Sequence, residues 1–131
     1  MNAPKDLFKS PIPIFRSFDE ALARSFYLHF LEFTLLFEHR FDDAAPFYMG
    51  VQNGDFTLHL SEHFGDASPG SHIRVAVDDV STLSQRLRNK AYKHARPGAP
   101  VRQPWGMLEL SISDPFGNRL TFFQEITQSD T

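Results

Sequence analysis

The feature that most constrains the fold is an order of predicted elements that occurs twice, on either side of a turn-rich segment. Residues 63–70 contain two glycines, a proline and an aspartate, a composition typical of a linker. Hydrophobic periodicity predicts a strand, a helix and three strands before this segment, and the same order after it. We therefore predict an α+β fold of two βαβββ modules, residues 11–62 and 71–125, within a single domain spanning residues 1–131.

The first module begins with a short strand and a helix. Pro11 and Pro13 flank Ile12 and lack backbone N–H donors, which predicts that this strand lies at a sheet edge. Ser17 and Glu20 have the spacing of a capping box, so we expect the helix to begin there. Apolar residues four positions apart mark the helix, namely Leu22, Phe26 and Phe30.

Three strands complete this module, at residues 33–41, 47–52 and 56–62. The dipeptide Asn53-Gly54 between the last two is a strong signal for a tight hairpin.

The second module follows the same plan. A strand is predicted at residues 71–77, and either Asp78 or Asp79 can cap the helix after it. One face of that helix carries Val80, Leu83 and Leu87. Three strands then follow, at residues 101–105, 108–113 and 120–124.

Composition limits the partners and the cellular location. The formal charge is −3 over 131 residues, and no basic stripe is evident, which argues against nucleic acid as a partner. The apolar runs are too short to span a membrane, and the N-terminus lacks the apolar segment of a signal peptide. No cysteine is present, which excludes disulfides and thiol catalysis. We expect a cytoplasmic protein.

Two motifs near the C-terminus carry a family resemblance. Gln103-Pro104-Trp105-Gly106 is followed eight residues later by Asp114-Pro115-Phe116-Gly117-Asn118. Together they resemble the last hairpin of the vicinal oxygen chelate superfamily, which includes glyoxalases, bleomycin resistance proteins and dioxygenases, and within it the bleomycin resistance branch. The resemblance implies a curved mixed sheet around a concave cleft, with modules paired across a homodimer. Glu32 and Ala91 stand where this superfamily usually has glycines after its helices.

The resemblance also allows a metal site to be assessed. Metal-dependent members bind one divalent ion through strand positions that correspond here to Ile12, His59, His72 and Thr121. Only the two histidines are good ligands, whereas a catalytic divalent site normally needs three protein ligands. We therefore expect no metal or other cofactor. The alternative is a metal-dependent lyase, isomerase or dioxygenase, in which Glu109 would join His59 and His72 as the third ligand.

The competing function is binding in an aromatic groove. The resemblance places Trp105 and Tyr48 in a ligand groove at the dimer interface, where they would stack on a flat ligand. Further candidates for the groove are Phe37, Phe41, Phe47, Ser61 and Gly117, with His59, His72 and Glu109 as polar contacts. For Phe37 and Phe47, packing in the core is the simpler alternative.

Acidic residues near the second and third strands bear on the charge of the ligand. Glu38, Asp42, Asp43 and Asp55 cluster there and would favour a positively charged ligand, although Arg40 weakens the effect. Our leading hypothesis is non-catalytic drug sequestration of the bleomycin resistance type. The ligand would be small and partly aromatic, and could be cationic. A groove without any ligand is a further alternative.

Overall fold

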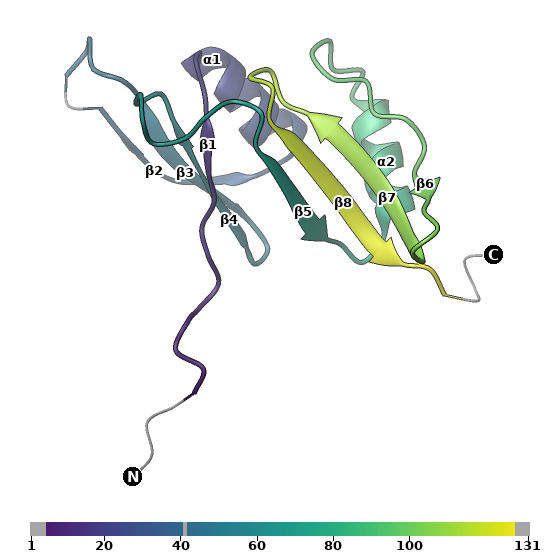
Figure 1. Cartoon of the computed structure of the whole chain (residues 1–131). Helices are drawn as coiled ribbons and strands as arrows, with labels where there is room; N and C mark the ends of the chain where they lie inside the picture. Colours follow the sequence, from purple (N-terminus) through teal and green to yellow (C-terminus); the bar gives the residue numbers. More distant parts are fainter. Residues whose placement is uncertain (1–4, 41, 128–131) are drawn as a thin grey trace.

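The computed structural model describes residues 5–40 and 42–127. The first module comprises β1 (Ile14–Arg16), α1 (Glu20–Ala23), the π-helix η1 (Arg24–Phe30), β2 (Thr34–His39), β3 (Tyr48–Asn53) and β4 (Phe56–Ser61). The second comprises β5 (His72–Ala76), α2 (Val80–Asn89), β6 (Val101–Arg102), β7 (Met107–Ser113) and β8 (Arg119–Glu125). The predicted order of two βαβββ modules is confirmed (Figure 1).

Each module forms its own four-stranded mixed sheet. The strand orders are β1-β4-β3-β2 and β5-β8-β7-β6, so the two sheets have the same topology. The first strand of each module runs parallel to the last, and the other pairs are antiparallel. Strand β1 lies at a sheet edge, as its flanking prolines predicted. Strand β6 is shorter than expected, because a turn replaces its predicted C-terminal half.

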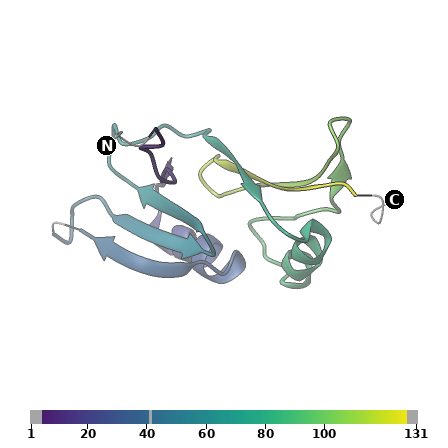
Figure 2. The same ribbon diagram turned by 90° about the horizontal axis from the view of Figure 1, so that it is seen from below.

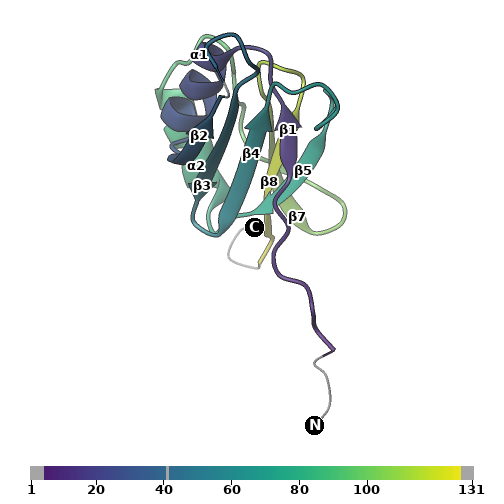
Figure 3. The ribbon, with the colours of Figure 1, turned by 90° about the vertical axis from the view of Figure 1, so that its left-hand side faces the viewer.

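Both helical segments lie on the same side of the molecule, and the strands lie on the other (Figure 3). Apolar side chains from the helices and from one face of each sheet form the core. Its largest fully buried members include Tyr27, Phe26, Phe30, Phe15, Met49, Leu58, Leu87 and Leu120. Seen from below, the two sheets stand side by side (Figure 2). We call the sheet faces opposite the helices the open faces.

The first helical segment begins two residues later than predicted. Ser17 is buried, and its backbone N–H donates to the Ser61 carbonyl at 2.9 Å, so it extends the β1–β4 pairing and does not cap the helix. Asp19 is the N-cap, with an extended backbone and a carboxylate that accepts the Leu22 N–H at 2.9 Å. In the second module Asp79 caps α2 in the same way.

The Asp114–Asn118 turn between β7 and β8 joins the two modules. The buried Asp114 carboxylate accepts the backbone N–H groups of Phe116 and Asn118 at 2.8 and 2.9 Å. Tyr27, in the first module, donates its hydroxyl to Asp114 Oδ2 at 2.6 Å. The Asn118 side chain donates to the Arg16 carbonyl at 2.9 Å. One turn of the second module thus satisfies polar groups from the helix and the first strand of the other.

The two departures from the family pattern occupy left-handed backbone positions. Glu32 has a φ of 62° and Ala91 a φ of 49°. Both lie just past the end of a helical segment, where glycine is the residue without a steric cost. Glu32 also forms ion pairs with Arg86 and Lys90. Over the described ranges, no helix is both long and apolar enough to cross a membrane.

Replacing Tyr27 with phenylalanine removes the buried hydrogen bond between the modules. We expect the free energy of unfolding to fall by about 1.5–3 kcal/mol, because a hydrogen bond to a buried charged group is lost. Chemical denaturation measures this change. The control is Tyr92→Phe, which removes the less buried bond to Ser25 and should cost about 1 kcal/mol or less. Equal losses in the two variants would contradict the role given to the Asp114 turn.

Replacing Ala91 with glycine should stabilise the protein. The left-handed backbone costs an alanine about 1 kcal/mol, and glycine adopts it without a clash. Because glycine also gives the unfolded chain more freedom, we expect a net gain of about 0.5 kcal/mol. A lower denaturation midpoint in Ala91→Gly would show that α2 does not end in this conformation.

Candidate functional site

The open face of the first sheet carries an aromatic cluster. Strand register places Phe37, Gly50 and His59 in one row across β2, β3 and β4. The Phe37 ring lies over Gly50, because a Cβ added there would be 2.3 Å from Phe37 Cε1. The side chain of Phe37 is 42% exposed despite its size. Glycine at this position therefore allows an aromatic ring to lie flat on the open face.

Tyr48 extends this cluster and fixes the histidine. Its ring stacks on Phe37, with centroids 6.0 Å apart and planes 17° apart. Its hydroxyl lies 2.7 Å from His59 Nδ1. Desolvation lowers the pKa of His59 and raises the pKa of Tyr48, with Asp66 adding to the second shift. At neutral pH the cluster is an uncharged surface suited to stacking on a flat molecule.

The open face of the second sheet carries the only tryptophan. Trp105 is 60% exposed in the turn between β6 and β7, and its indole N–H donates to Glu109 Oε2 at 2.8 Å. Arg74 on β5 donates to the same oxygen at 2.6 Å, and its guanidinium lies 4.7 Å from the centre of the Phe123 ring. The bond from Arg74 lowers the pKa of Glu109, so this carboxylate, only 7% exposed, is ionised.

A chain of polar side chains continues along the same face. His72 Nε2 lies 2.7 Å from Thr121 Oγ1, which lies 2.8 Å from Ser111 Oγ. His72 Nδ1 faces an Arg119 nitrogen at 3.4 Å. The pKa of His72 is lowered by desolvation first and by the positive charges of Arg119 and Arg74 next. Its imidazole is therefore neutral at pH 7.

The remaining predicted residues lie at different places relative to these two surfaces. Phe47 is buried, and Arg24 and Arg40 lie over its ring, so it follows the core-packing alternative. Ser61 pairs with Tyr48 across β3 and β4 and so lies beside the first surface, where it is fully buried and donates to Asp66 at 2.6 Å. Gly117 belongs to the β7–β8 turn, whereas Trp105 lies at the other end of β7. Phe41 lies outside the described residues.

Several residues of these surfaces were not identified from the sequence. Gly50 and Arg74 were missed, and Ser111 and Thr121 were not recognised as a pair. The signal was present in the alternation of β7 and β8, because both hydroxyls fall on the polar face of their strands. Their contact depends on the register that pairs Ser111 with Thr121, which the periodicity of one strand cannot supply.

The three candidate metal ligands come from both sheets. His59 is on β4 of the first sheet, whereas His72 and Glu109 are on β5 and β7 of the second. Among the residues that the structure describes, no three histidine or acidic side chains are grouped so that they could hold a metal ion. Glu109 is already engaged by Arg74 and Trp105. A set of His59, His72 and Glu109 is therefore not assembled within one chain.

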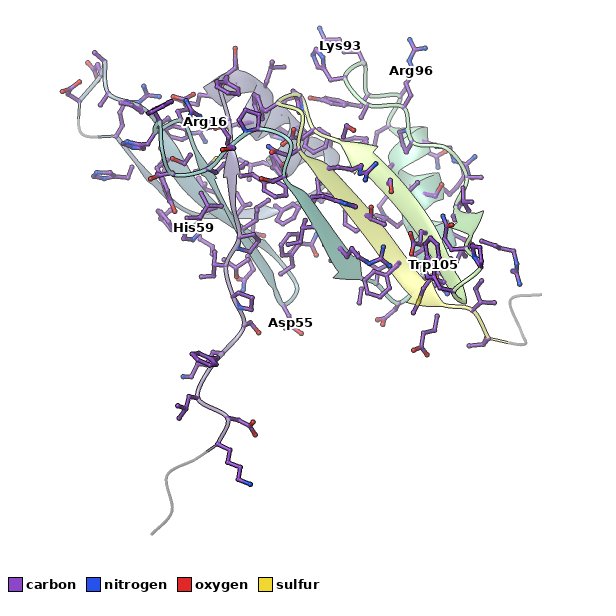
Figure 4. All side chains as sticks on the ribbon, viewed as in Figure 1. Arg16, Asp55, His59, Lys93, Arg96 and Trp105 are labelled. Atoms are coloured by element: carbon purple, nitrogen blue, oxygen red, sulfur yellow. The ribbon has the colours of Figure 1, made fainter. Side chains whose placement is uncertain are left out.

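The two surfaces lie apart in the single chain. Figure 4 shows His59 on the first sheet and Trp105 at the far side of the second. Among the described residues, one hollow of about 420 Å³ is lined by the end of α2 and the loop after it, and another of about 460 Å³ is lined by the ends of β5 and β8, including Phe123. The second hollow therefore borders the surface that carries Trp105.

The fold and the candidate site together define a class of protein. Its members have paired βαβββ modules, with helices on one side and sheet faces that carry polar and aromatic side chains on the other. A family model described as "Glyoxalase superfamily protein" matches residues 3–129. The chain thus belongs to the glyoxalase superfamily, as the two motifs predicted. No curated protein sequence matches it significantly.

Several solved structures share this fold. A bleomycin-binding protein complexed with bleomycin is 24% identical, with a TM-score of 0.69, 90% of this chain covered and 99% of that one. The bleomycin-binding protein from bleomycin-producing Streptomyces verticillus is also 24% identical, with a TM-score of 0.67 and coverages of 94% and 99%. TnmS3, an antibiotic binding protein from Streptomyces sp. CB03234, is 25% identical, with a TM-score of 0.69 and coverages of 92% and 99%.

The lowered pKa values of His59 and His72 predict a pH dependence of stability. Because both pKa values lie below the unfolded value near 6.5, the unfolded chain binds protons more readily. The contribution of these two histidines to the free energy of unfolding is thus fully present above pH 6.5. It is lost as the pH falls through their folded pKa values. Denaturation midpoints at pH 7.5 and 5 should decline less in His59→Gln than in the wild type. The control is His29→Gln, on the exposed side of η1, and an equal decline in all three proteins would contradict the prediction.

Proposed function

We propose that this protein binds a small, partly aromatic molecule and sequesters it without catalysis. The observation that carries the proposal is the pair of exposed aromatic surfaces on the open faces. Phe37 and Tyr48 form one of them over Gly50, and Trp105 with Phe123 forms the other. Exposed rings held in fixed orientations favour stacking on a flat ligand.

A homodimer would bring the two surfaces together. In a two-fold dimer the same pair of surfaces meets twice, so the first sheet of one copy can face the second sheet of its partner. Each groove would then have Phe37 and Tyr48 on one wall and Trp105 on the other. Apolar residues exposed on the open faces, Ile14 beside His59 and Val101 beside Glu109, support this arrangement, because such residues are commonly buried in an interface.

The structural neighbours guide the choice of ligand. Two of them are bleomycin-binding proteins, and TnmS3 is an antibiotic binding protein. Antibiotics of the bleomycin class are therefore the first compounds to test, beside simpler planar aromatics. Drug sequestration needs only tight binding, for which the described surfaces supply stacking groups and hydrogen-bond donors.

The experiment follows Trp105 fluorescence while bleomycin and simple aromatic compounds are titrated into the purified protein. We expect saturable binding with one ligand per chain, and a dimer by sedimentation. Phe37→Ala should weaken binding about tenfold, the equivalent of one lost stacking contact. The control is Phe18→Ala, which removes an exposed aromatic beside the start of α1 and should leave the affinity unchanged.

Two outcomes would contradict the proposal. One is the absence of binding by every aromatic compound in the series. The other is stoichiometric uptake of zinc, nickel, manganese or iron(II) that is lost in His72→Ala, detected by elemental analysis. That second result would instead support a metal-dependent glyoxalase-like enzyme, with ligands drawn from two copies of the chain.

A further inference from the structure

The histidine on the open face of the second sheet has a definite hydrogen-bond direction. Arg119 can only donate, so His72 Nδ1, at 3.4 Å from it, must accept. His72 Nε2 then carries the proton and donates to Thr121 Oγ1 at 2.7 Å. The Thr121 hydroxyl lies 2.8 Å from Ser111 Oγ, and either of these two hydroxyls can donate to the other.

This chain of polar groups ends on an exposed hydroxyl. Ser111 is exposed, whereas Thr121, opposite it on β8, is buried. A hydroxyl proton rotates to suit its partner, so Ser111 can donate to an acceptor on a bound ligand. Arg119 is exposed as well, and it lies diagonally from Ser111 across the β7–β8 ladder, where Ser113 pairs with Arg119 and Ser111 with Thr121. A guanidinium has five N–H groups, so Arg119 has donors to spare.

Glu109, the buried carboxylate of this strip, already has two partners. Glu109 Oε2 accepts both Arg74 and Trp105, and Glu109 is almost completely buried. An exposed carboxylate of this face, Glu125, lies at the far end of β8 from Arg119, where it pairs with Met107. The contacts of Arg119 and Ser111 in the described residues are to His72 and Thr121, so these two donors have no acidic partner. A ligand that lies along this strip satisfies those donors only if it presents acceptor oxygens.

The acidic residues expected to attract a cation do not face this strip. Glu38 forms an ion pair with Arg24 of the helical side. Asp42 accepts the Ala44 N–H and closes a turn at 2.9 Å. Asp55 lies at the tip of the β3–β4 hairpin, as Figure 4 shows. Within one chain, Glu38, Asp42 and Asp55 therefore lie away from Arg119.

We propose that the ligand of this groove is an aromatic acid, whose carboxylate or equivalent anion is bound by Arg119 and Ser111 while its ring system stacks on the neighbouring aromatic side chains. This inference rests on the proposed binding function and adds the charge of the ligand. The acid would lie at the Arg119 end of the strip, and Trp105 and Phe123 would mark the aromatic end.

Three probes with the same ring system and similar size test the charge preference: 2-naphthoate, 2-naphthamide and 2-naphthylmethylammonium, titrated at pH 7.5 with Trp105 fluorescence as the readout. We expect naphthoate to bind about tenfold tighter than naphthamide, as for one hydrogen-bonded ion pair. Arg119→Gln should abolish that preference, because it weakens naphthoate binding far more than naphthamide binding, and Arg119→Lys should restore part of it. Ser111→Ala should weaken naphthoate binding about fivefold. The control is Arg86→Gln on α2, which removes an equally exposed cation away from the open faces.

The outcomes separate this inference from the function on which it rests. Equal affinities for the three probes, or tightest binding of the ammonium compound, would overturn the acid preference while aromatic binding stands. A preference for naphthoate that survives in Arg119→Gln would also overturn the assignment. If none of the probes binds, both the acid preference and the proposed function are contradicted. Circular dichroism establishes that each variant is folded.

Discussion

The buried carboxylate of Asp114 is the interaction on which the arrangement of the two modules depends. It orders its own turn through two backbone N–H groups and accepts the hydroxyl of Tyr27 from the other module. Burial and the neighbouring carboxylate raise the pKa of Tyr27 well above its usual value, so this hydroxyl stays protonated. Asn118 adds a bond to the carbonyl of Arg16. A buried carboxylate is tolerated only where its oxygens accept hydrogen bonds. Here the donors to the Asp114 oxygens come from both modules.

Once the modules are joined in this way, the chemistry of the sheets is divided between their faces. The helices cover the apolar faces, so the open faces carry the polar and aromatic side chains that the strand period directs away from the core. On the first sheet the result is a stacked pair of rings over Gly50. On the second it is a strip of hydrogen-bond donors beside Trp105. Neither surface alone encloses a molecule, which is the reason for inferring a groove made by two copies.

Much of the fold follows from local patterns in the sequence. Period-two alternation predicted β4 and β7, and spacing by four predicted the helical segments, because these patterns report which side of an element is buried. The left-handed backbone of Ala91 was indicated by a departure from the expected glycine. The site was less predictable. Phe47 lies in the core and Gly117 lies far from Trp105 along β7, and the pairing of Ser111 with Thr121 requires a register between strands. Contacts between residues far apart in the sequence cannot be predicted from the periodicity of a single segment.

The central claim is that each groove is shared between two copies, and mixed dimers test it most directly. One variant would lose the first-sheet surface through Phe37→Ala and Tyr48→Ala, and the other would lose the second-sheet surface through Trp105→Ala and Arg119→Gln. Neither variant should bind naphthoate tightly alone. After the two are unfolded together and refolded, shared grooves predict that tight sites return at about one quarter of the wild-type number, because half of the dimers are mixed and each has one intact groove. Calorimetric titration counts these sites. No return of tight binding in a sample with demonstrated mixed dimers would contradict the account.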